Sequence, residues 1–267
     1  MNLRRAYAIF LRQIFLLRGS PTRLFQIFVW TLLDIVLWGF ITQYLNSVAA
    51  AKFSFLPVFL GAVVLENFLT RVQQGVAVAF FEDVWSRNFL NVFASPLRVS
   101  EYLAGLVSTS VITSAVALVA MMLLAGAVFG LSLLSLGALL IPFLLILLLF
   151  GVALGIFATA VVLRFGPASE WFVWPIPMIL APFVGVFYPI ATLPSWMQAV
   201  SWALPPSYVF EGLRGVVLEG RFSAGLLALG VALALTYVAL AYGLFRLVYR
   251  TVIRRGLIAR YSAETVS

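Results

Sequence analysis

Long apolar segments dominate the pattern of this chain, and short polar stretches separate them. Six segments are long enough to cross a hydrocarbon core of about 30 Å at about 1.5 Å of rise per residue. The pattern therefore predicts an all-α membrane protein with six transmembrane helices. Gly151 and Gly155 in the fourth span have the G-x-x-x-G spacing that permits close helix packing. The predicted spans are 24–45, 55–81, 101–131, 136–163, 171–188 and 224–248.

Residues 1–23, before the first span, have the pattern of an amphipathic helix that lies in the membrane interface. Apolar residues recur at helical spacing, and arginines lie beside them. Two interpretations stay open: the helix only orients the chain, or it also docks a partner. The apolar stripe consists of Leu3, Tyr7, Phe10, Ile14 and Leu17, and the arginines are Arg4, Arg5, Arg12, Arg18 and Arg23.

A charged, amphipathic stretch at 81–97 lies between the second and third spans. It opens with Glu82 and Asp83 and ends at Ser95 and Pro96. Acidic residues at the start and a proline at the end predict a helix of about two to three turns. Such a helix fits a membrane surface, with its polar face toward the cytoplasm. The alternative is an interfacial loop that the proline ends.

Prolines interrupt the last third of the chain. Pro175, Pro177 and Pro182 fall within the fifth span, where each removes a backbone donor, so we expect a kinked helix beside a pathway. Two short apolar pieces follow within 194–219, headed by Pro194-Ser195 and Pro206-Ser207. They are too short to cross a bilayer, which favours re-entrant or interfacial helices. Glu211 and Arg214 have the i,i+3 spacing of an ion pair.

Charged residues also occur inside the first two spans. An ionised side chain at mid-bilayer costs at least about 2.5 kcal/mol, so Asp34, Glu66 and Arg71 should face protein or water. Asp34 and Arg71 fall at similar depth in two antiparallel spans, so we hypothesise that they pair. The alternative is that each binds backbone or water inside an assembly.

Composition agrees with membrane insertion. The 267 residues are 64% hydrophobic and 10% charged, with a mean hydropathy of +1.11. Cysteine and histidine are absent, which excludes thiolate and imidazole chemistry and the usual zinc ligands. Lys52, the lone lysine, does not follow glycine, so the chain has no phosphate-binding G-x-x-x-x-G-K-[ST] loop. We therefore expect no enzyme, no bound metal and no bound cofactor, and any ATP hydrolysis must come from another polypeptide.

The net charge of +8 comes from arginines that gather at the two ends and in short loops. This distribution orients a membrane protein and favours contact with anionic lipid, so we expect no nucleic acid. The positive-inside rule predicts both termini and residues 81–97 in the cytoplasm. We expect a multi-pass protein of a cell membrane, the bacterial inner membrane. The chain is interpreted as one transmembrane domain, 1–267, in which 24–163 holds four spans, 171–248 the last two, and 249–267 a cytoplasmic tail.

Two sequence strings carry a resemblance to a known family. EDVWSRNFLNVFASPL and GVFYPIATLPSWMQAVSWALPPSYVFEGLRG, in this order among six spans, resemble the permease subunits of type-2 ATP-binding-cassette exporters. The resemblance covers nearly the whole chain. In that family the first string corresponds to a coupling helix that inserts into the ATPase subunit. The second corresponds to a pair of re-entrant helices near the outer face, here with Pro194, Trp196, Pro206, Tyr208, Glu211 and Arg214.

The resemblance implies a dimer with a second copy or a paralogue, two separate ATPase subunits that bind ATP and magnesium, and a path lined by the first, second and fifth spans. Coupling would use the polar residues Glu82, Asp83 and Arg87, the apolar residues Phe89, Leu90 and Phe93, and the exit at Ser95 and Pro96. Candidate pathway residues are Asp34, Glu66, Arg71, Trp171, Trp174, Phe183, Phe187 and Tyr188. For the aromatic ones, packing against lipid is the alternative.

Two other functions compete with an ATP-driven exporter. An ATP-independent secondary transporter or channel would use Asp34, Glu66 and Arg71 as an ion or proton relay. A lipid-modifying membrane enzyme needs a base or a metal near the interface, and this chain offers only scattered carboxylates. The substrate stays open among a drug, a lipid and a glycan.

Overall fold

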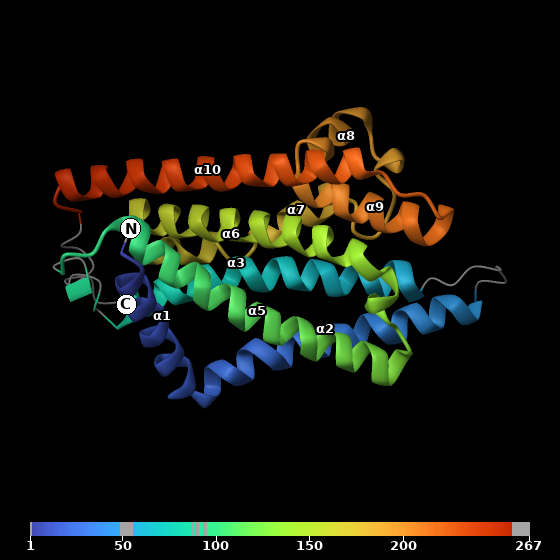
Figure 1. The fold of residues 1–267 in the computed structure, drawn as a ribbon, viewed down its shortest axis with the longest axis horizontal. Helices are drawn as coiled ribbons and strands as arrows, with labels where there is room; N and C mark the ends of the chain where they lie inside the picture. The colour runs from blue at the N-terminus through green and yellow to red at the C-terminus, as the bar shows by residue number, and fades with distance from the viewer. Residues whose placement is uncertain (1, 49–55, 87, 89–90, 93–94, 258–267) are drawn as a thin grey trace.

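The computed structural model describes residues 2–48, 56–86, 88, 91–92 and 95–257, and the regular elements in these ranges are all helical. The labels follow Figure 1. The π-helical or 3-10 segments are η1 (Leu56–Leu60), η2 (Leu133–Leu139), η3 (Pro167–Phe172) and η4 (Ile190–Thr192). The α-helices are α1 (Leu3–Arg18), α2 (Pro21–Val48), α3 (Gly61–Trp85), α5 (Val99–Phe129), α6 (Leu140–Phe165), α7 (Ile176–Val184), α8 (Ser195–Trp202), α9 (Pro205–Glu219) and α10 (Ala224–Arg254).

The long helices run along the long axis of the molecule as a bundle, with α6 near its centre (Figure 1). The most extensive contacts are those of α6 with α10 and with α3, and α5 covers another side of α3. α1 packs against the first part of α5 and leads directly into α2. The α3, α5, α6 and α10 helices contribute most of the buried apolar residues, so the core lies between them.

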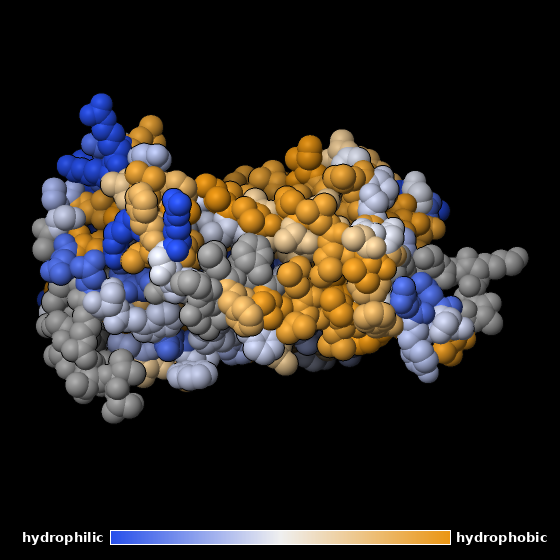
Figure 2. All heavy atoms as spheres, turned by 90° about the horizontal axis from the view of Figure 1, so that it is seen from below, coloured by the Kyte–Doolittle hydropathy of each residue, from blue (hydrophilic) through white to orange (hydrophobic). Residues whose placement is uncertain are grey.

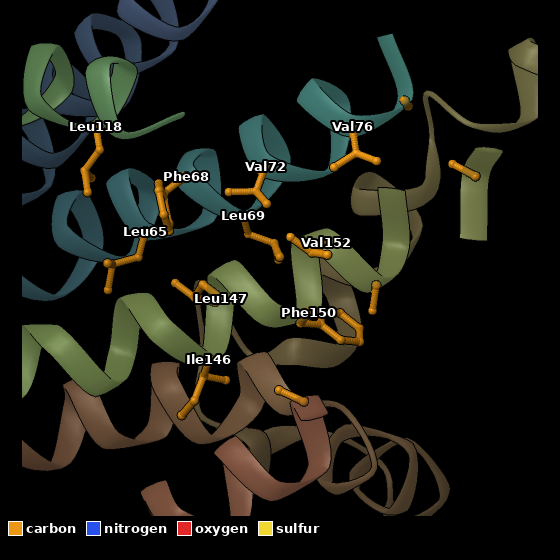
Figure 3. Packing of buried hydrophobic residues seen from close by; sticks show 14 of the residues in the cluster. Leu65, Phe68, Leu69, Val72, Val76, Leu118, Ile146, Leu147, Phe150 and Val152 are labelled. Carbon is orange, nitrogen blue, oxygen red and sulfur yellow. The ribbon is translucent and has the colours of Figure 1, made fainter. Parts of the chain in front are cut away.

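Two glycines set the close contact between α6 and α3. A Cβ atom added at Gly151 would lie 2.8 Å from Cβ of Val72, and one at Gly155 would lie 2.6 Å from Cβ of Val76. Figure 3 shows Val72 and Val76 in this packed layer. The G-x-x-x-G pattern is therefore confirmed as a helix contact, and its partner is α3 of the same chain.

Among the described residues, three helical stretches satisfy both the length and the hydropathy expected of a membrane span: Val99–Phe129, Leu133–Phe165 and Ala224–Arg254. α2 and α3, with 28 and 25 residues, are also long enough to cross about 30 Å at about 1.5 Å per residue. The chain is thus an all-helical membrane protein. The count of six spans stays a prediction.

The fifth predicted span, 171–188, is not one helix. Its α-helical part is α7, which has nine residues and is too short to cross a bilayer alone. Pro175 precedes α7, Pro182 lies inside it, and Gly185 ends it with a φ of 70°. The missing proline donors and the left-handed glycine explain why a continuous helix does not form.

The two ends of the bundle differ in what they carry. The first helix α1, the end of α3, the start of α5 and the end of α10 lie at one end, called here the α1 end (Figure 1). α8, α9 and the start of α10 lie at the opposite end, called the α9 end. Figure 2 shows an apolar band over the middle of one face, with hydrophilic residues concentrated toward the α1 end. An apolar band between polar ends is the expected surface of a membrane protein.

Candidate functional site

The predicted coupling stretch, 81–97, begins inside α3 rather than in a helix of its own. α3 continues to Trp85, so Glu82 and Asp83 belong to its last turns. Their exposed fractions are 5% and 0%. The prediction that these two acids offer a polar face to the cytoplasm is therefore wrong. They face other helices of the same chain, where a buried carboxylate can find partners.

The remainder of this stretch, together with residue 98, forms the link between α3 and α5, called here the coupling segment, residues 86–98. Asn91 is exposed and Val92 is buried, and both are helical. The Ser95 hydroxyl donates to the Val92 carbonyl at 2.6 Å, and Pro96 follows before α5 begins at Val99. The predicted contact residues Arg87, Phe89, Leu90 and Phe93 lie outside the described residues, so their role stays a prediction.

Asp83 is where α1, α3 and α5 meet. The guanidinium of Arg12 on α1 donates to its carboxylate, and the Tyr102 hydroxyl on α5 donates to the other carboxylate oxygen at 2.7 Å. Tyr102 is fully buried. Because a buried carboxylate is tolerated when it is paired and hydrogen-bonded, this cluster joins the end of α3 to both neighbouring helices.

Glu101 forms a second cluster on the other side of the coupling segment. Its carboxylate accepts the backbone N–H of Asn2 at 2.6 Å and that of Arg98 at 3.0 Å, which caps the start of α5. Arg5 lies 3.7 Å from the same carboxylate and also donates to the Pro96 carbonyl. Glu101 thus binds the beginning of α1 to the point where the coupling segment enters α5.

The α1 helix is docked on the chain between these two clusters. Ile9 packs so closely on Gly105 of α5 that an added Cβ would lie 2.5 Å from its Cγ2 atom, and Gln13 donates to the Ala79 carbonyl on α3 at 3.0 Å. The first two residues of the predicted apolar stripe do not make this contact, because Leu3 is 72% and Tyr7 58% exposed. α1 therefore turns Ala6, Ile9 and Gln13 toward the protein and leaves the start of its apolar stripe able to meet lipid.

A cavity of about 500 Å³ lies between α1, α2, α3 and α5. Its long wall is one stripe of α3, in which the residues recur three or four apart as on a single helix face. Apolar and aromatic residues in its walls include Leu17, Trp30, Val78, Trp85 and Trp174. The residues with polar side chains are Gln13, Arg71, Gln74, Glu82, Thr109, Thr113 and Ser114.

The charged residues of the first two spans have polar partners within the protein. The Asp34 carboxylate accepts a hydrogen bond from Asn67 at 2.6 Å, and Arg71 donates to Gln74. Asn67 lies one turn before Arg71, so Asp34 meets α3 through an amide, and a pair of Asp34 with Arg71 stays a prediction. Glu66 accepts from Thr70 at 3.0 Å on its own helix. Of the three predicted pathway charges, Arg71 is the one that lines the cavity.

The aromatic candidates of the fifth segment do not form one site. Trp174 lines the cavity and packs on Phe81, with ring centroids 6.2 Å apart. Phe187 stacks on Trp38 of α2 at 4.6 Å, and Phe183 contacts Trp196 of α8. Two others lie elsewhere: Trp171 is 76% exposed, and the Tyr188 hydroxyl donates to the Pro182 carbonyl.

At the α9 end, the predicted ion pair between Glu211 and Arg214 is confirmed at 3.0 Å. Arg214 also donates to the Gly185 and Val186 carbonyls, and the Glu211 carboxylate accepts the Ile190 N–H at 2.7 Å. The pair therefore ties α9 to the turn after α7. The other residues of this motif lie in or just before α8 and α9. Pro194 precedes α8, and Trp196 within α8 is exposed. Pro206 is in the first turn of α9, and the Tyr208 hydroxyl donates to the Trp202 carbonyl. Re-entry of α8 and α9 into the membrane stays a prediction.

The sequence reasoning missed Arg5, Arg12, Tyr102 and Glu101. One signal was present: the two arginines are seven residues apart, which places them on the same face of α1. The sequence also shows that Asp83 and Glu101 flank the coupling segment, but only the fold shows that both bind α1. Over the described ranges, no cluster of three or more His, Cys, Asp or Glu side chains is arranged to hold a metal ion.

Comparison with known proteins addresses the function. A family model described as ABC-2 type transporter matches residues 6–218. The match includes most of α1, the coupling segment, the cavity and nearly all of α9. No curated protein matches the chain.

Proposed function

The chain belongs to the ABC-2 type transporter family, and from this premise we propose that it is the permease of an ATP-driven exporter. It is the transmembrane subunit of an ABC transporter, and members of this family generally work with ATPase subunits. The proposed assembly is a dimer of this permease, or a pair with a paralogue, bound to two ATPase subunits that hold ATP and magnesium. An ATP-independent relay does not fit a subunit of an ABC transporter.

One observation supports coupling at the α1 end most directly: α1 binds the chain on both sides of the coupling segment. Arg12 is paired with Asp83 before it, and Arg5 and the Asn2 N–H bind Glu101 after it. An ATPase that pushes on this segment would therefore displace α1 together with the ends of α3 and α5. Buried, paired contacts of this kind transmit displacement because they do not deform gradually.

The connection from α1 to α2 supports a path for this displacement to the substrate. α1 ends at Arg18 and α2 begins at Pro21, so only two residues separate the helices. α2 contributes Trp30 to the cavity lining, whereas α3 is held against α6 by the glycine contacts. A rigid-body tilt of α1 and α2 against α3 would change the width of the cavity during the ATPase cycle.

Cross-linking tests the coupling proposal. The chain contains no cysteine, so Asn91→Cys in the coupling segment introduces a single thiol at an exposed position. Each ABC ATPase subunit of the source cell is co-expressed with this variant in turn, and disulfide capture to a cysteine on the ATPase surface is measured. We expect capture by one ATPase, and faster capture when ATP is bound.

The matched control is Glu219→Cys, an exposed position at the α9 end, which should give no capture. Capture at residue 219 but not at residue 91, or no capture with any ATPase while the permease is folded, would contradict coupling through this segment.

A further inference from the structure

The cavity beside α3 has a polar end and an apolar wall, which is the arrangement of a ligand site. Its volume of about 500 Å³ lies in the range of pockets that hold small molecules. Such sites are lined mainly by apolar and aromatic groups and contain a few polar groups that orient the ligand. Nothing in the coupling mechanism requires these polar groups.

Arg71 and Gln74 form the polar end on the α3 side. They are one turn apart on the cavity-lining stripe, and the guanidinium donates to the Gln74 side-chain oxygen. This bond directs the Gln74 oxygen to Arg71 and leaves the amide N–H groups of Gln74 as donors near the same position. Arg71 lies in the middle part of α3, about 21 Å along the helix from Trp85, which corresponds to membrane depth.

Ser114 adds a donor from the opposite wall. Its side chain is 1% exposed, it lines the cavity, and its hydroxyl has no hydrogen-bond partner among the described residues. The Ser110 hydroxyl one turn earlier on α5 donates to the Val72 carbonyl at 2.7 Å. Because α5 and α3 are antiparallel, this contact places Ser114 at about the depth of Arg71. A buried hydroxyl without a partner is costly, and a ligand oxygen would satisfy it.

From these observations we propose that the cavity binds the anionic head group of an amphipathic molecule, held by Arg71, Gln74 and Ser114. Guanidinium groups bind phosphate and carboxylate oxygens by charge-assisted, often bidentate, hydrogen bonds. The apolar part of the ligand packs on apolar and aromatic lining residues such as Trp30, Trp174, Val78 and Leu17. The proposal rests on the proposed transport function, since it names the class of substrate that the permease accepts.

The other charged groups near this end of the cavity are carboxylates, and none of them lies beside Arg71 in the cavity wall. Glu82 also lines the cavity, but it is 11 residues from Arg71, about 16 Å along α3. Its carboxylate is therefore too far away to share a ligand group with Arg71. Asp34 and Glu66 lie about one turn beyond Arg71 and bind Asn67 and Thr70, and neither lines the cavity.

A cysteine-protection assay tests this inference without the ATPase. Thr113→Cys places a single thiol in the cavity wall of the otherwise cysteine-free chain. The full-length variant is held in nanodiscs of zwitterionic lipid, and its alkylation rate is measured with four probes. Octyl phosphate, octyl glucoside and octyltrimethylammonium share one tail and differ in head group, and inorganic phosphate has no tail. We expect octyl phosphate to slow alkylation at a concentration at which the other three do not.

Two substitutions identify the residues that bind the head group. Arg71→Gln in the Thr113→Cys background should raise the octyl phosphate concentration needed for half-maximal protection by about tenfold, because it removes a charge-assisted bond. Arg71→Lys should retain part of the protection, and Ser114→Ala should weaken it less than Arg71→Gln. Arg246→Gln, an exposed arginine of α10 at the α1 end, is the matched control and should leave protection unchanged.

Equal protection by octyl glucoside or by inorganic phosphate would overturn the proposal, as would full protection in a folded Arg71→Gln variant. Protection by octyltrimethylammonium alone would assign the cavity to a cation and overturn it too. The alkylation assay uses the permease alone, so its failure leaves the coupling proposal in place. Conversely, a missing ATPase cross-link does not affect the ligand result.

Discussion

Asp83 shows how one buried residue can change the interpretation of a whole segment. Its position after a long apolar run predicts an acidic helix start at a membrane surface, but in the fold it is fully buried. Arg12 and Tyr102, which bind it, are 71 and 19 residues away in the chain. Asp83 therefore acts as a junction of three helices next to the coupling segment. An ATPase bound to that segment would contact neighbouring residues rather than this carboxylate.

A double-mutant cycle at Arg12 and Asp83 tests this junction. Arg12→Gln leaves the buried Asp83 carboxylate without its charge partner, which typically costs about 3–5 kcal/mol, whereas Asp83→Asn leaves the partly exposed Arg12 unpaired and should cost less. The double variant keeps a neutral hydrogen-bonding pair. We therefore expect its loss of unfolding free energy to be smaller than the sum of the two single losses by at least about 1 kcal/mol. Unfolding in detergent, followed by circular dichroism, measures all three variants.

Arg4→Gln provides the control for this cycle, because Arg4 is an exposed arginine on the same helix. It should change stability by less than about 0.5 kcal/mol. Strictly additive effects of the Arg12 and Asp83 substitutions would show that the two side chains do not interact in the folded protein.

At the scale of elements, the helices differ in how firmly they are held. α6 is fixed between α3 and α10, and its glycines allow backbone contact with α3. α2 instead runs from the docked helix α1 and lines the cavity opposite α3. α7 is a short helix between a proline and a left-handed glycine. The bundle therefore combines a tightly packed α3, α6 and α10 layer with an α1 and α2 pair that packs mainly on α5.

Replacing a single glycine tests the tight layer. Gly155→Ala would place its Cβ 2.6 Å from Cβ of Val76, and overpacking of this kind costs about 1–3 kcal/mol. Gly243→Ala on α10 is the matched control, since an added Cβ there has nothing within 4 Å. We expect Gly155→Ala to lower the midpoint of thermal unfolding and Gly243→Ala to leave it unchanged or raise it slightly. Equal midpoints for the two variants would argue against the described α3–α6 contact.

At the scale of the whole molecule, the two ends have distinct chemistry. The α1 end carries the coupling segment and the clusters around Asp83 and Glu101. The α9 end carries the short helices α8 and α9, which the Glu211 and Arg214 pair joins to the turn after α7. The cavity lies between α1, α2, α3 and α5. This arrangement suits a subunit that receives motion at one end and handles its substrate within the membrane.

Cysteine labelling in intact cells tests the orientation of the ends. The positive-inside pattern predicts the α1 end in the cytoplasm. A membrane-impermeant maleimide should therefore label Glu219→Cys in intact cells, and Asn91→Cys only after the membrane is permeabilised. Both positions are exposed, so access to the thiol does not differ for reasons of burial. Labelling of residue 91 in intact cells would reverse the proposed topology.

The sequence alone determined the class of the protein and much of its helical organisation. Hydropathy indicates a membrane protein because a chain with 10% charged residues cannot form a water-facing surface of ordinary composition. The prolines mark the starts of α8 and α9 and the break in the fifth segment, because proline restricts its own backbone wherever it lies. The spacing of Glu211 and Arg214 predicted their pair, since residues three apart on a helix are neighbours.

The tertiary structure decided the contacts between residues that are distant in sequence. Local pattern shows that a residue is acidic, but not whether it is buried, so the cluster of Asp83 with Arg12 and Tyr102 required the fold. The partner of Gly155, the hydrogen bond from Asn67 to Asp34, and the cavity at Arg71 also depend on how separate helices pack. Helix register and crossing geometry arise from many weak contacts at once, and no short stretch of the sequence specifies them.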